Sequence, residues 1–337
     1  MSDDAACAEH EQVFSALILR YALLFNVACS VAAIPLLLLV IKATYQHKLV
    51  HYNIKWILIF HFSCLVVHDA FRLVNHIWDL TLFITTSPGE CNLYRTERCL
   101  FLRIPINLTM YIAFSGTFML SIERCIATWK LQTYGKNRVV GPVIVFVQIL
   151  LGLTFMFVVY YELEHQARMP YCLITSLSPP TLVIGSISVL VLLQVIAVVI
   201  FEVLVRINQV SKQHLLHSRT ANVSDGVISR LYQVRENVRT METLMLFFLV
   251  SCLNGFFYNL LRGFVHLNKT KFSRPLFYAL IEVSIHLPQS SLIVPAVLWY
   301  SYRKVSRKAA AEHQEKLDRA AHENTNLHFN IIAESWR

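Results

Sequence analysis

Four of the long apolar stretches in this 337-residue chain carry side chains that ionise or form strong hydrogen bonds. At 100° per residue, the polar groups within each stretch fall on one face of a helix. Such groups could bind a polar small molecule, join helices through ion pairs or, through histidine, coordinate zinc. They are His61, His68, Asp69, Arg72, His76 and Asp79 in the first of these stretches, Arg103 and Asn107 in the second, Asn254, Tyr258 and Arg262 in the third, and Glu282, His286 and Gln289 in the fourth.

The composition indicates the setting in which these stretches fold. Of all residues, 55% are hydrophobic and only 15% are charged, whereas about 25% are charged in a soluble domain. A membrane helix needs about 20 mostly apolar residues. The sequence therefore predicts an all-α membrane protein, a bundle of seven transmembrane helices over about 17–41, 55–82, 100–128, 139–161, 181–205, 241–265 and 275–299.

The distribution of Lys and Arg predicts the orientation of the bundle, because cytoplasmic loops are enriched in these residues. One side holds 20 of them and the other holds 8, and the richer side comprises 42–55, 124–138, 206–239 and 301–337. We therefore expect an extracellular N-terminus over 1–16, a seven-helix domain over 17–300, and a cytoplasmic tail over 301–337 that begins with a short interfacial helix. The net charge of +9 then reflects orientation and contact with membrane lipids, and nucleic acid is not an expected partner.

Two features of the predicted outer side concern covalent modification. Four cysteines lie in this oxidising compartment, and since four cysteines allow three complete pairings, their spacing leaves the connectivity open. Asn268 begins an Asn-Lys-Thr sequon in the last outer loop, which predicts glycosylation at that residue. The four cysteines are Cys7, Cys91, Cys99 and Cys172.

Two motifs connect the chain with a known family. Cys99 and the Glu123-Arg124 pair stand at opposite ends of the third stretch, separated by about 37 Å of helix, and Cys172 lies in the second outer loop. This arrangement resembles a G-protein-coupled receptor. The chain is more narrowly similar to the nematode serpentine chemoreceptors of classes A, AB and B, and to class AB in particular, through Ser121-Ile122-Glu123-Arg124-Cys125-Ile126-Ala127-Thr128 and Arg230-Leu231-Tyr232-Gln233-Val234-Arg235-Glu236-Asn237-Val238.

The resemblance implies a receptor without enzymatic activity or cofactor that binds a small external chemical and activates a heterotrimeric G protein. It also implies a disulfide between Cys99 and Cys172, with Cys91 as the alternative partner, and a multi-pass location in the plasma membrane of sensory-neuron cilia. By the same resemblance Glu123 and Arg124 form a switch. The residues expected to couple to the G protein are Glu123, Arg124, Tyr232, Arg235 and Arg239.

One departure from rhodopsin-like receptors changes the expected mechanism. Where those receptors carry Asn-Pro-X-X-Tyr, this chain reads Val294-Pro295-Ala296-Val297-Leu298. Activation through that polar switch is therefore not expected. The range 275–299 also contains no Lys, which excludes a retinal Schiff base at the opsin-like position.

The polar side chains of the outer half have two interpretations of about equal weight. They could line a ligand cavity open to the exterior, or they could form an internal network of ion pairs, for example Asp69 with Arg72 or Arg262 with Glu282. We expect a structural role for the deeper residues His61, His68 and Asp69. The candidate ligand-binding residues are Arg72, His76, Arg103, Asn107, Tyr258, Arg262, Glu282 and His286.

Two other functional classes compete with the receptor hypothesis. A seven-span zinc hydrolase could use His61, His68 and His286, but a catalytic zinc needs about three protein ligands and the last stretch has no second histidine one turn from His286. No metal site is therefore expected. A transporter or channel is disfavoured because the chain shows no internal repeat, and an insect-type olfactory channel would need an N-terminus on the inner side.

Overall fold

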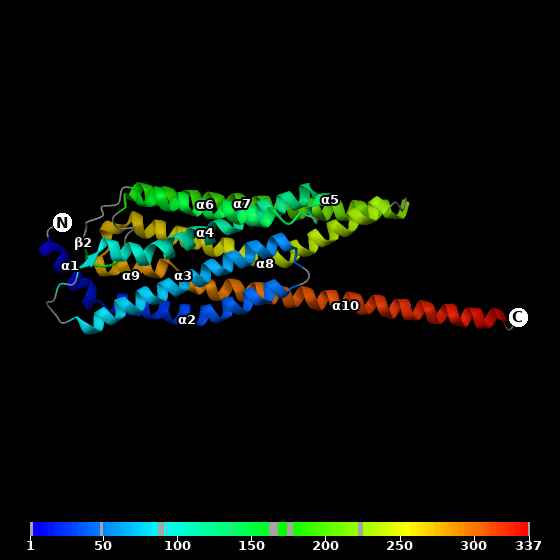
Figure 1. The fold of residues 1–337 in the computed structure, drawn as a ribbon, viewed down its shortest axis with the longest axis horizontal. Coiled ribbons are helices and arrows are strands. Elements are labelled where there is room, and N and C mark those ends of the chain that lie inside the picture. Colours follow the sequence, from blue (N-terminus) through cyan, green and yellow to red (C-terminus); the bar gives the residue numbers. More distant parts are fainter. Residues whose placement is uncertain are drawn as a thin grey trace.

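The computed structural model covers the whole chain and describes all residues except 1–2, 48–49, 87–90, 92, 136, 162–167, 174–177, 222–224 and 336–337. Seven long apolar helices run roughly parallel to the long axis of the molecule (Figure 1). The predicted number of transmembrane helices is thus confirmed. They are α2 (Leu17–Gln46), α3 (Tyr52–Thr85), α4 (Thr96–Trp129), α6 (Val140–Tyr160), α7 (Pro180–Ala221), α8 (Asp225–Leu267), and α9 (Arg274–Ser284) continued by α10 (Leu287–Ser335).

The remaining elements are short and lie at the two ends of the bundle. One end, the disulfide end, carries α1 (Asp3–Ser15) and the antiparallel strands β1 (Tyr94–Arg95) and β2 (Arg168–Met169), which pair Tyr94 with Met169. It also carries the 3-10 turn η2 (Lys269–Lys271). The opposite end, the tail end, carries α5 (Leu131–Tyr134) and the extended C-terminal part of α10 (Figure 1).

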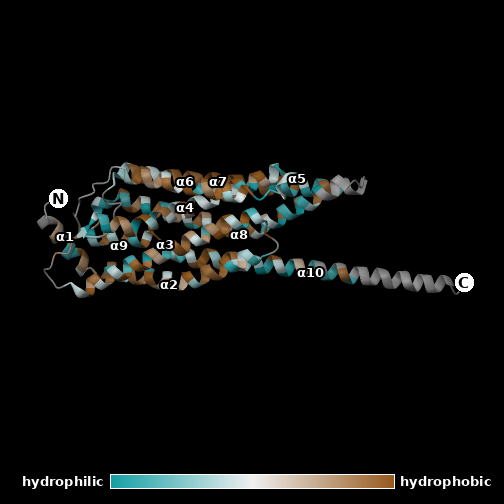
Figure 2. Ribbon diagram, in the orientation of Figure 1, coloured by the Kyte–Doolittle hydropathy of each residue, from teal (hydrophilic) through white to brown (hydrophobic). Residues whose placement is uncertain are grey.

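Helix α4 occupies the centre of the bundle. It packs against α3, α6, α7 and α8, and most of its length is buried, including Tyr111, Ser115 and Ser121. Large apolar side chains of the outer helices, such as Phe146 and Leu192, are exposed, and Figure 2 shows that hydrophobic residues predominate along the helices of the bundle. This distribution is that of a protein whose outer surface contacts lipid.

The seventh span is interrupted near its middle. Helix α9 ends at Ser284, and α10 begins at Leu287. Pro288 is the physical cause, because its ring clashes with the carbonyl four residues earlier and it has no amide hydrogen to donate. The break leaves His286 between the two helices, with its amide donating to the Ser284 carbonyl at 2.8 Å.

Three helices continue beyond their predicted apolar cores at the tail end. Helices α7 and α8 both extend past the predicted spans, and the α8 extension includes the segment 229–241 that reads as helix in the sequence. The tail differs from its prediction, because α10 continues without a break through 301–335 where a short interfacial helix was expected. Segment 301–335 contains neither Pro nor Gly, so nothing in it ends the helix locally.

Candidate functional site

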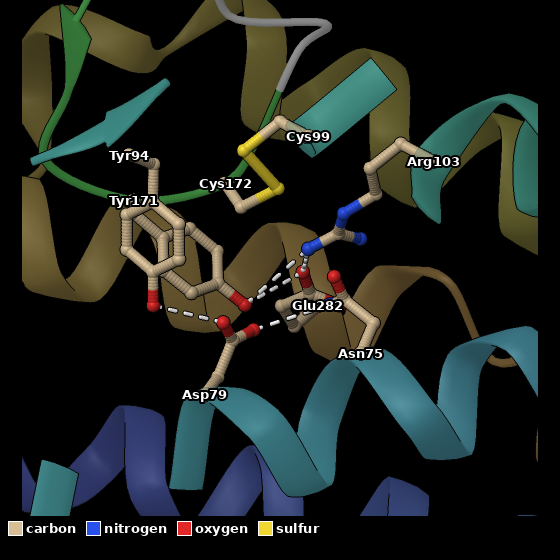
Figure 3. Close-up of a disulfide and its surroundings, with 8 residues drawn as sticks. All are labelled: Asn75, Asp79, Tyr94, Cys99, Arg103, Tyr171, Cys172 and Glu282. Carbon is tan, nitrogen blue, oxygen red and sulfur yellow. Dashed lines mark hydrogen bonds and ion pairs between the residues drawn. A yellow bond between two sulfur atoms is a disulfide. The ribbon is translucent and has the colours of Figure 1, made fainter. Parts of the chain in front are cut away.

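Glu282 is the centre of a buried group of charges near the disulfide end (Figure 3). Its carboxylate accepts from Arg103 at 2.6 Å and from Arg72 at 3.0 Å. The Tyr171 hydroxyl donates to it at 2.9 Å, and His76 Nε2 lies 3.6 Å away. We call these five residues the outer ion cluster, and each of them is at least 98% buried.

Four segments far apart in the sequence bring this cluster together. Arg72 and His76 are one turn apart on α3, and the Arg72 Nε donates to His76 Nε2 at 3.0 Å. Arg103 projects from the first turns of α4, and Glu282 from the last turn of α9. Tyr171 follows β2 and precedes Cys172, whose disulfide with Cys99 fixes the loop above Arg103 (Figure 3).

A second carboxylate extends the polar region toward the β1–β2 hairpin. Asp79 accepts from the Tyr94 hydroxyl at 2.9 Å and from the Asn75 amide at 3.1 Å (Figure 3). Burial, reinforced by the charge of Asp79, raises the pKa of Tyr94, and burial together with Glu282 raises the pKa of Tyr171. Both phenols therefore remain protonated hydrogen-bond donors at physiological pH.

Some hydrogen-bond donors of the outer ion cluster have no acceptor within the cluster. Arg72 Nη1, Arg103 Nε and His76 Nδ1 are buried and have no hydrogen-bond partner among the described residues. Since His76 Nε2 accepts from Arg72, His76 Nδ1 is the protonated nitrogen in the neutral ring. Three buried donor atoms thus remain without a partner in a cluster that contains two guanidinium groups and one carboxylate.

The other four candidate ligand residues lie apart from Glu282. The Tyr258 hydroxyl contacts Arg262 and lies 2.8 Å from the sulfur of Met110, while Asn107 hydrogen-bonds Tyr160. His286 Nε2 lies 3.1 Å from the Asn254 carbonyl, and its ring centroid is 5.8 Å from that of Tyr258. His286 also lines a groove of about 570 Å³ whose other walls are apolar side chains of α8 and α9.

Neither of the two ion pairs suggested by the sequence forms. Arg72 and Arg103 share Glu282, so Arg262 pairs instead with Tyr258. Asp69 points toward Ser30 of α2 at 3.5 Å. The reason is geometric, because residues three apart on a helix differ by about 60° in direction, and here Asp69 faces α2 while Arg72 faces α9.

The deeper histidines have separate surroundings. His68 Nδ1 lies 3.0 Å from the Ile106 carbonyl, whereas the His61 ring packs against Phe62 and Phe247. His61 also lines a cavity of about 30 Å³ in the middle of the bundle. Together with the position of His286 between α9 and α10, this means that the structure does not bring the three histidines of the zinc hypothesis together. The described part of the chain contains no group of three potential ligands able to hold a metal.

A second polar cluster lies at the tail end and is centred on Arg124. Its guanidinium binds both Glu123 oxygens, at 2.5 and 2.6 Å, and donates to the Asn237 side-chain oxygen of α8 at 2.8 Å. The Tyr134 hydroxyl contacts Glu123 as well. Arg124 is only 1% exposed, so this is no ordinary surface arginine. We call Glu123, Arg124, Tyr134, Asn237, Asn208 and Thr128 the inner polar cluster.

Asn237 connects this cluster to a third helix. Its amide donates to Asn208 of α7 at 2.7 Å and to Thr128 at 3.1 Å. The ring of His51, the residue before α3, is tilted against that of Tyr134, with ring centroids 4.5 Å apart. Burial, and then the charge of Arg124, lowers the pKa of His51.

The other residues predicted to couple to a G protein lie outside the inner polar cluster. Tyr232 is 70% exposed and Arg235 is exposed, while Arg239 forms an ion pair with Glu312 at 3.5 Å. Asn237 was missed although it belongs to the same sequence motif. Tyr171 was also missed, although its position beside Cys172 was a usable signal; nothing in the sequence pointed to Tyr134 or Asn208.

The cysteines and the sequon complete the account of the predicted residues. The structure pairs Cys99 with Cys172, and it pairs Cys91 with Cys7 of α1. Both bonds lie at the disulfide end. Asn268 follows α8 at that same end, and its side-chain amide donates to the Phe264 carbonyl at 2.9 Å.

Comparison with known proteins identifies the family. A family model for the serpentine type 7TM GPCR receptor class ab chemoreceptor matches residues 4–337. Serpentine receptor class alpha/beta-14 of Caenorhabditis elegans is 30% identical over 53% of this chain, a match that spans 45% of that receptor. Serpentine receptor class alpha-18 of the same organism is 23% identical over 94% of this chain and 97% of its own length. The chain therefore belongs to the class ab family of serpentine seven-transmembrane chemoreceptors.

Proposed function

We propose that this protein is a chemosensory receptor that binds a small external molecule in the outer half of its bundle and activates a heterotrimeric G protein. The disulfide end is the extracellular end in this proposal, because disulfides form in oxidising compartments and the cation-rich loops lie at the opposite end. The protein acts in the plasma membrane, and its family suggests sensory-neuron cilia as the site. No covalent chemistry is involved.

The single observation that carries the proposal is the contact of Arg124 with Asn237. Arg124 on α4 is buried, and its partner Asn237 lies on α8, so the guanidinium cannot reach the cytoplasm until α8 moves. Such a contact gives two arrangements, one with Arg124 covered and one with Arg124 available to a partner. A ligand at the other end can shift the population between them only if it binds one arrangement more tightly.

The ligand class follows from the unused donors of the outer ion cluster. Three donor atoms, on Arg72, Arg103 and His76, have no partner among the described side chains and backbone groups. A carbonyl or carboxylate oxygen supplies the acceptor that such donors require. Small ketones, esters and carboxylic acids are therefore the favoured ligands.

Ligand-independent signalling tests the proposal before any ligand is known. In cells that express the full chain with a promiscuous G protein, Asn237→Ala should raise basal signalling several-fold, because it removes one restraint on Arg124. Arg124→Ala should reach the cell surface and give neither basal nor ligand-evoked signal. The matched control is Glu236→Ala, which truncates an exposed side chain beside Asn237 on the same helix and should behave as wild type.

Two outcomes would contradict this function. Full signalling by Arg124→Ala at normal surface expression would remove the switch role of the arginine. Failure of Asn237→Ala to change basal signalling would show that its contact with Arg124 does not restrain α8. A panel of small ketones, esters and carboxylic acids, applied to the wild type, then tests the ligand class.

A further inference from the structure

The tail end of the bundle contains a cavity of about 700 Å³ between α4, α5, α7 and α8. Its polar wall includes Lys130, which lies between α4 and α5, and Arg230 near the start of the described side chains of α8. Its apolar wall includes Trp129, Leu131 and Ile207. A volume of this size is within the range of small-molecule sites, about 300–1,000 Å³.

The charges of the cavity favour an anionic occupant. Lys130 and Arg230 are both exposed and come from different segments of the chain, and the described residues that line the cavity include no carboxylate. The Ser211 hydroxyl is a further hydrogen-bond donor among the lining residues, whereas the Thr133 hydroxyl donates to the Lys130 carbonyl at 3.4 Å. Two cations with a nearby hydroxyl are a suitable set of ligands for a phosphate group.

The position of the cavity indicates that the occupant comes from the bilayer. Trp129 is 91% exposed at the end of α4, and Ile207 and Val210 are 47% and 65% exposed on the outward side of α7. Exposed tryptophan is typical of the membrane–water interface, and exposed aliphatic residues beside it are typical of a lipid-facing surface. The opening is therefore bordered by the kind of apolar surface that lipid covers.

We infer that this cavity binds one anionic phospholipid of the inner leaflet, with its phosphate-bearing headgroup on Lys130 and Arg230 and an acyl chain along Leu131 and Ile207. The assignment to the inner leaflet follows from the two disulfides, which lie at the opposite end of the bundle. Anionic lipids are concentrated in the cytoplasmic leaflet.

The bound lipid also contacts the inner polar cluster. Thr128 and Asn208 line the cavity, and the Asn208 amide donates to Thr128 at 3.0 Å. Asn237, the partner of Arg124, donates to both residues. Outward movement of α8 would separate Arg230 from Lys130, so the bound lipid stabilises the arrangement in which Arg124 is covered. This regulatory effect rests on the proposed receptor function, whereas lipid binding itself does not.

Native mass spectrometry of the purified full-length receptor tests the binding site without any signalling readout. Wild-type protein is mixed with phosphatidylcholine and, in separate arms, phosphatidylserine or phosphatidylinositol 4-phosphate. We expect one retained equivalent of anionic lipid. Lys130→Gln combined with Arg230→Gln should weaken retention by roughly 30-fold, because each cation near an anionic headgroup contributes about fivefold.

Two further variants distinguish the cavity from general surface charge. The control pair Arg303→Gln and Arg307→Gln removes two exposed cations of α10 at the same end and should leave retention within about twofold of wild type. Ser211→Phe keeps both cations but fills the cavity, and it should abolish retention. Thermal unfolding, followed by dye labelling of the buried thiols of Cys64 and Cys252, verifies that each variant is folded.

Four results would overturn the inference. Equal retention of phosphatidylcholine would remove the requirement for an anionic headgroup, and an equal loss in the α10 control pair would show diffuse electrostatic attraction. Retention by folded Ser211→Phe would place the lipid outside the cavity. If soluble glycerophosphoinositol 4-phosphate competes as well as the intact lipid, the occupant is a free phosphate compound and the acyl-chain contact is wrong.

Discussion

Glu282→Gln should destabilise the receptor. Its effect should be larger than that of replacing any other single Asp or Glu in the outer half of the bundle by its amide. The Glu282 carboxylate is the shared partner of two buried guanidinium groups, Arg72 and Arg103, and of the Tyr171 hydroxyl. Gln keeps the shape of the side chain and removes its charge. Breaking a buried ion pair by removing one partner costs about 3–5 kcal/mol, because an uncompensated charge remains in a medium of low polarity.

The expected shift in unfolding temperature follows from the size of the chain. Unfolding entropy scales with length at about 2.1 cal/mol/K per residue, and a chain of 337 residues therefore loses roughly 1.4 °C for each kcal/mol. A loss of about 3–5 kcal/mol corresponds to roughly 4–7 °C. The assay is thiol-dye labelling during heating in detergent, since Cys64 and Cys252 are free and buried in the folded protein.

A matched control and a compensating variant sharpen this prediction. Glu202→Gln breaks an exposed pair with Arg206 on α7 and should leave the transition almost unchanged, because exposed pairs contribute little. Replacing the whole ionic set, with Arg72→Met, Arg103→Met and Glu282→Leu together, should recover most of the lost stability. A shift below about 1 °C for Glu282→Gln alone would refute the view that Glu282 neutralises both arginines.

The triple variant also separates the two interpretations of the polar face. If the outer ion cluster only joins helices, the stable triple variant should respond to a ligand of the wild type with an unchanged concentration dependence. If the unused donors of Arg72 and Arg103 bind ligand, the same variant should fold and reach the surface yet lose the response. Stability and recognition are thus measured on one protein.

Three other predictions follow from single contacts. Gly255→Ala should destabilise the protein by about 1–3 kcal/mol, because a Cβ at this position overlaps the Gln194 amide. The control is Gly185→Ala, whose Cβ meets nothing within 4 Å and which should not destabilise the protein. Thermal unfolding measures both variants. Burial and the charge of Arg124 lower the pKa of His51 in the folded protein. As the pH falls below about 6.5, the unfolded chain therefore takes up a proton first, and the folded state loses stability. The unfolding temperatures at pH 7.5 and 5.5 should consequently differ less in His51→Gln than in wild type. Asn268→Gln should increase electrophoretic mobility by the equivalent of one glycan, and unchanged mobility would show that the sequon is not used.

The sequence predicts the framework of the fold because its signals are local. Apolar length alone identifies seven spans, and a repeat of 100° per residue places His76, Arg103 and Glu282 on faces that meet in the structure. Hydropathy does not mark the tail-end extensions of α7 and α8, because these helices are polar. The local signal for the α8 extension is instead the absence of Pro and Gly from 229–241. The break before Leu287 is readable only through Pro288, and a proline within a membrane helix produces either a kink or a break.

The partners of each polar residue are the part that the sequence does not determine. Arg72 has Asp69 three residues away, yet it binds Glu282, which is 210 positions distant in the chain. The choice depends on how α3 and α9 are rotated relative to one another, which is a property of the packed bundle. Tyr171 reaches Glu282 from a loop that the Cys99–Cys172 disulfide and the β1–β2 pairing both hold over the helices.

The outer ion cluster and the inner polar cluster differ in the free energy needed to separate their helices. This difference determines which end of the receptor moves more easily. Separating α9 from α3 and α4 would leave the charges of Glu282 and its arginines buried and unpaired, at about 3–5 kcal/mol. Separating α8 from Arg124 exchanges hydrogen bonds of Asn237 for hydrogen bonds to water at the end of the bundle, at about 1 kcal/mol each. If the receptor switches as proposed, we therefore expect the end that contains Glu282 to stay fixed and the end that contains Arg124 to move. A ligand that occupies the unused donors of Arg72 and Arg103 adds contacts to the fixed end, so its influence on α8 must pass through small changes in helix packing and does not require the ion pairs to break.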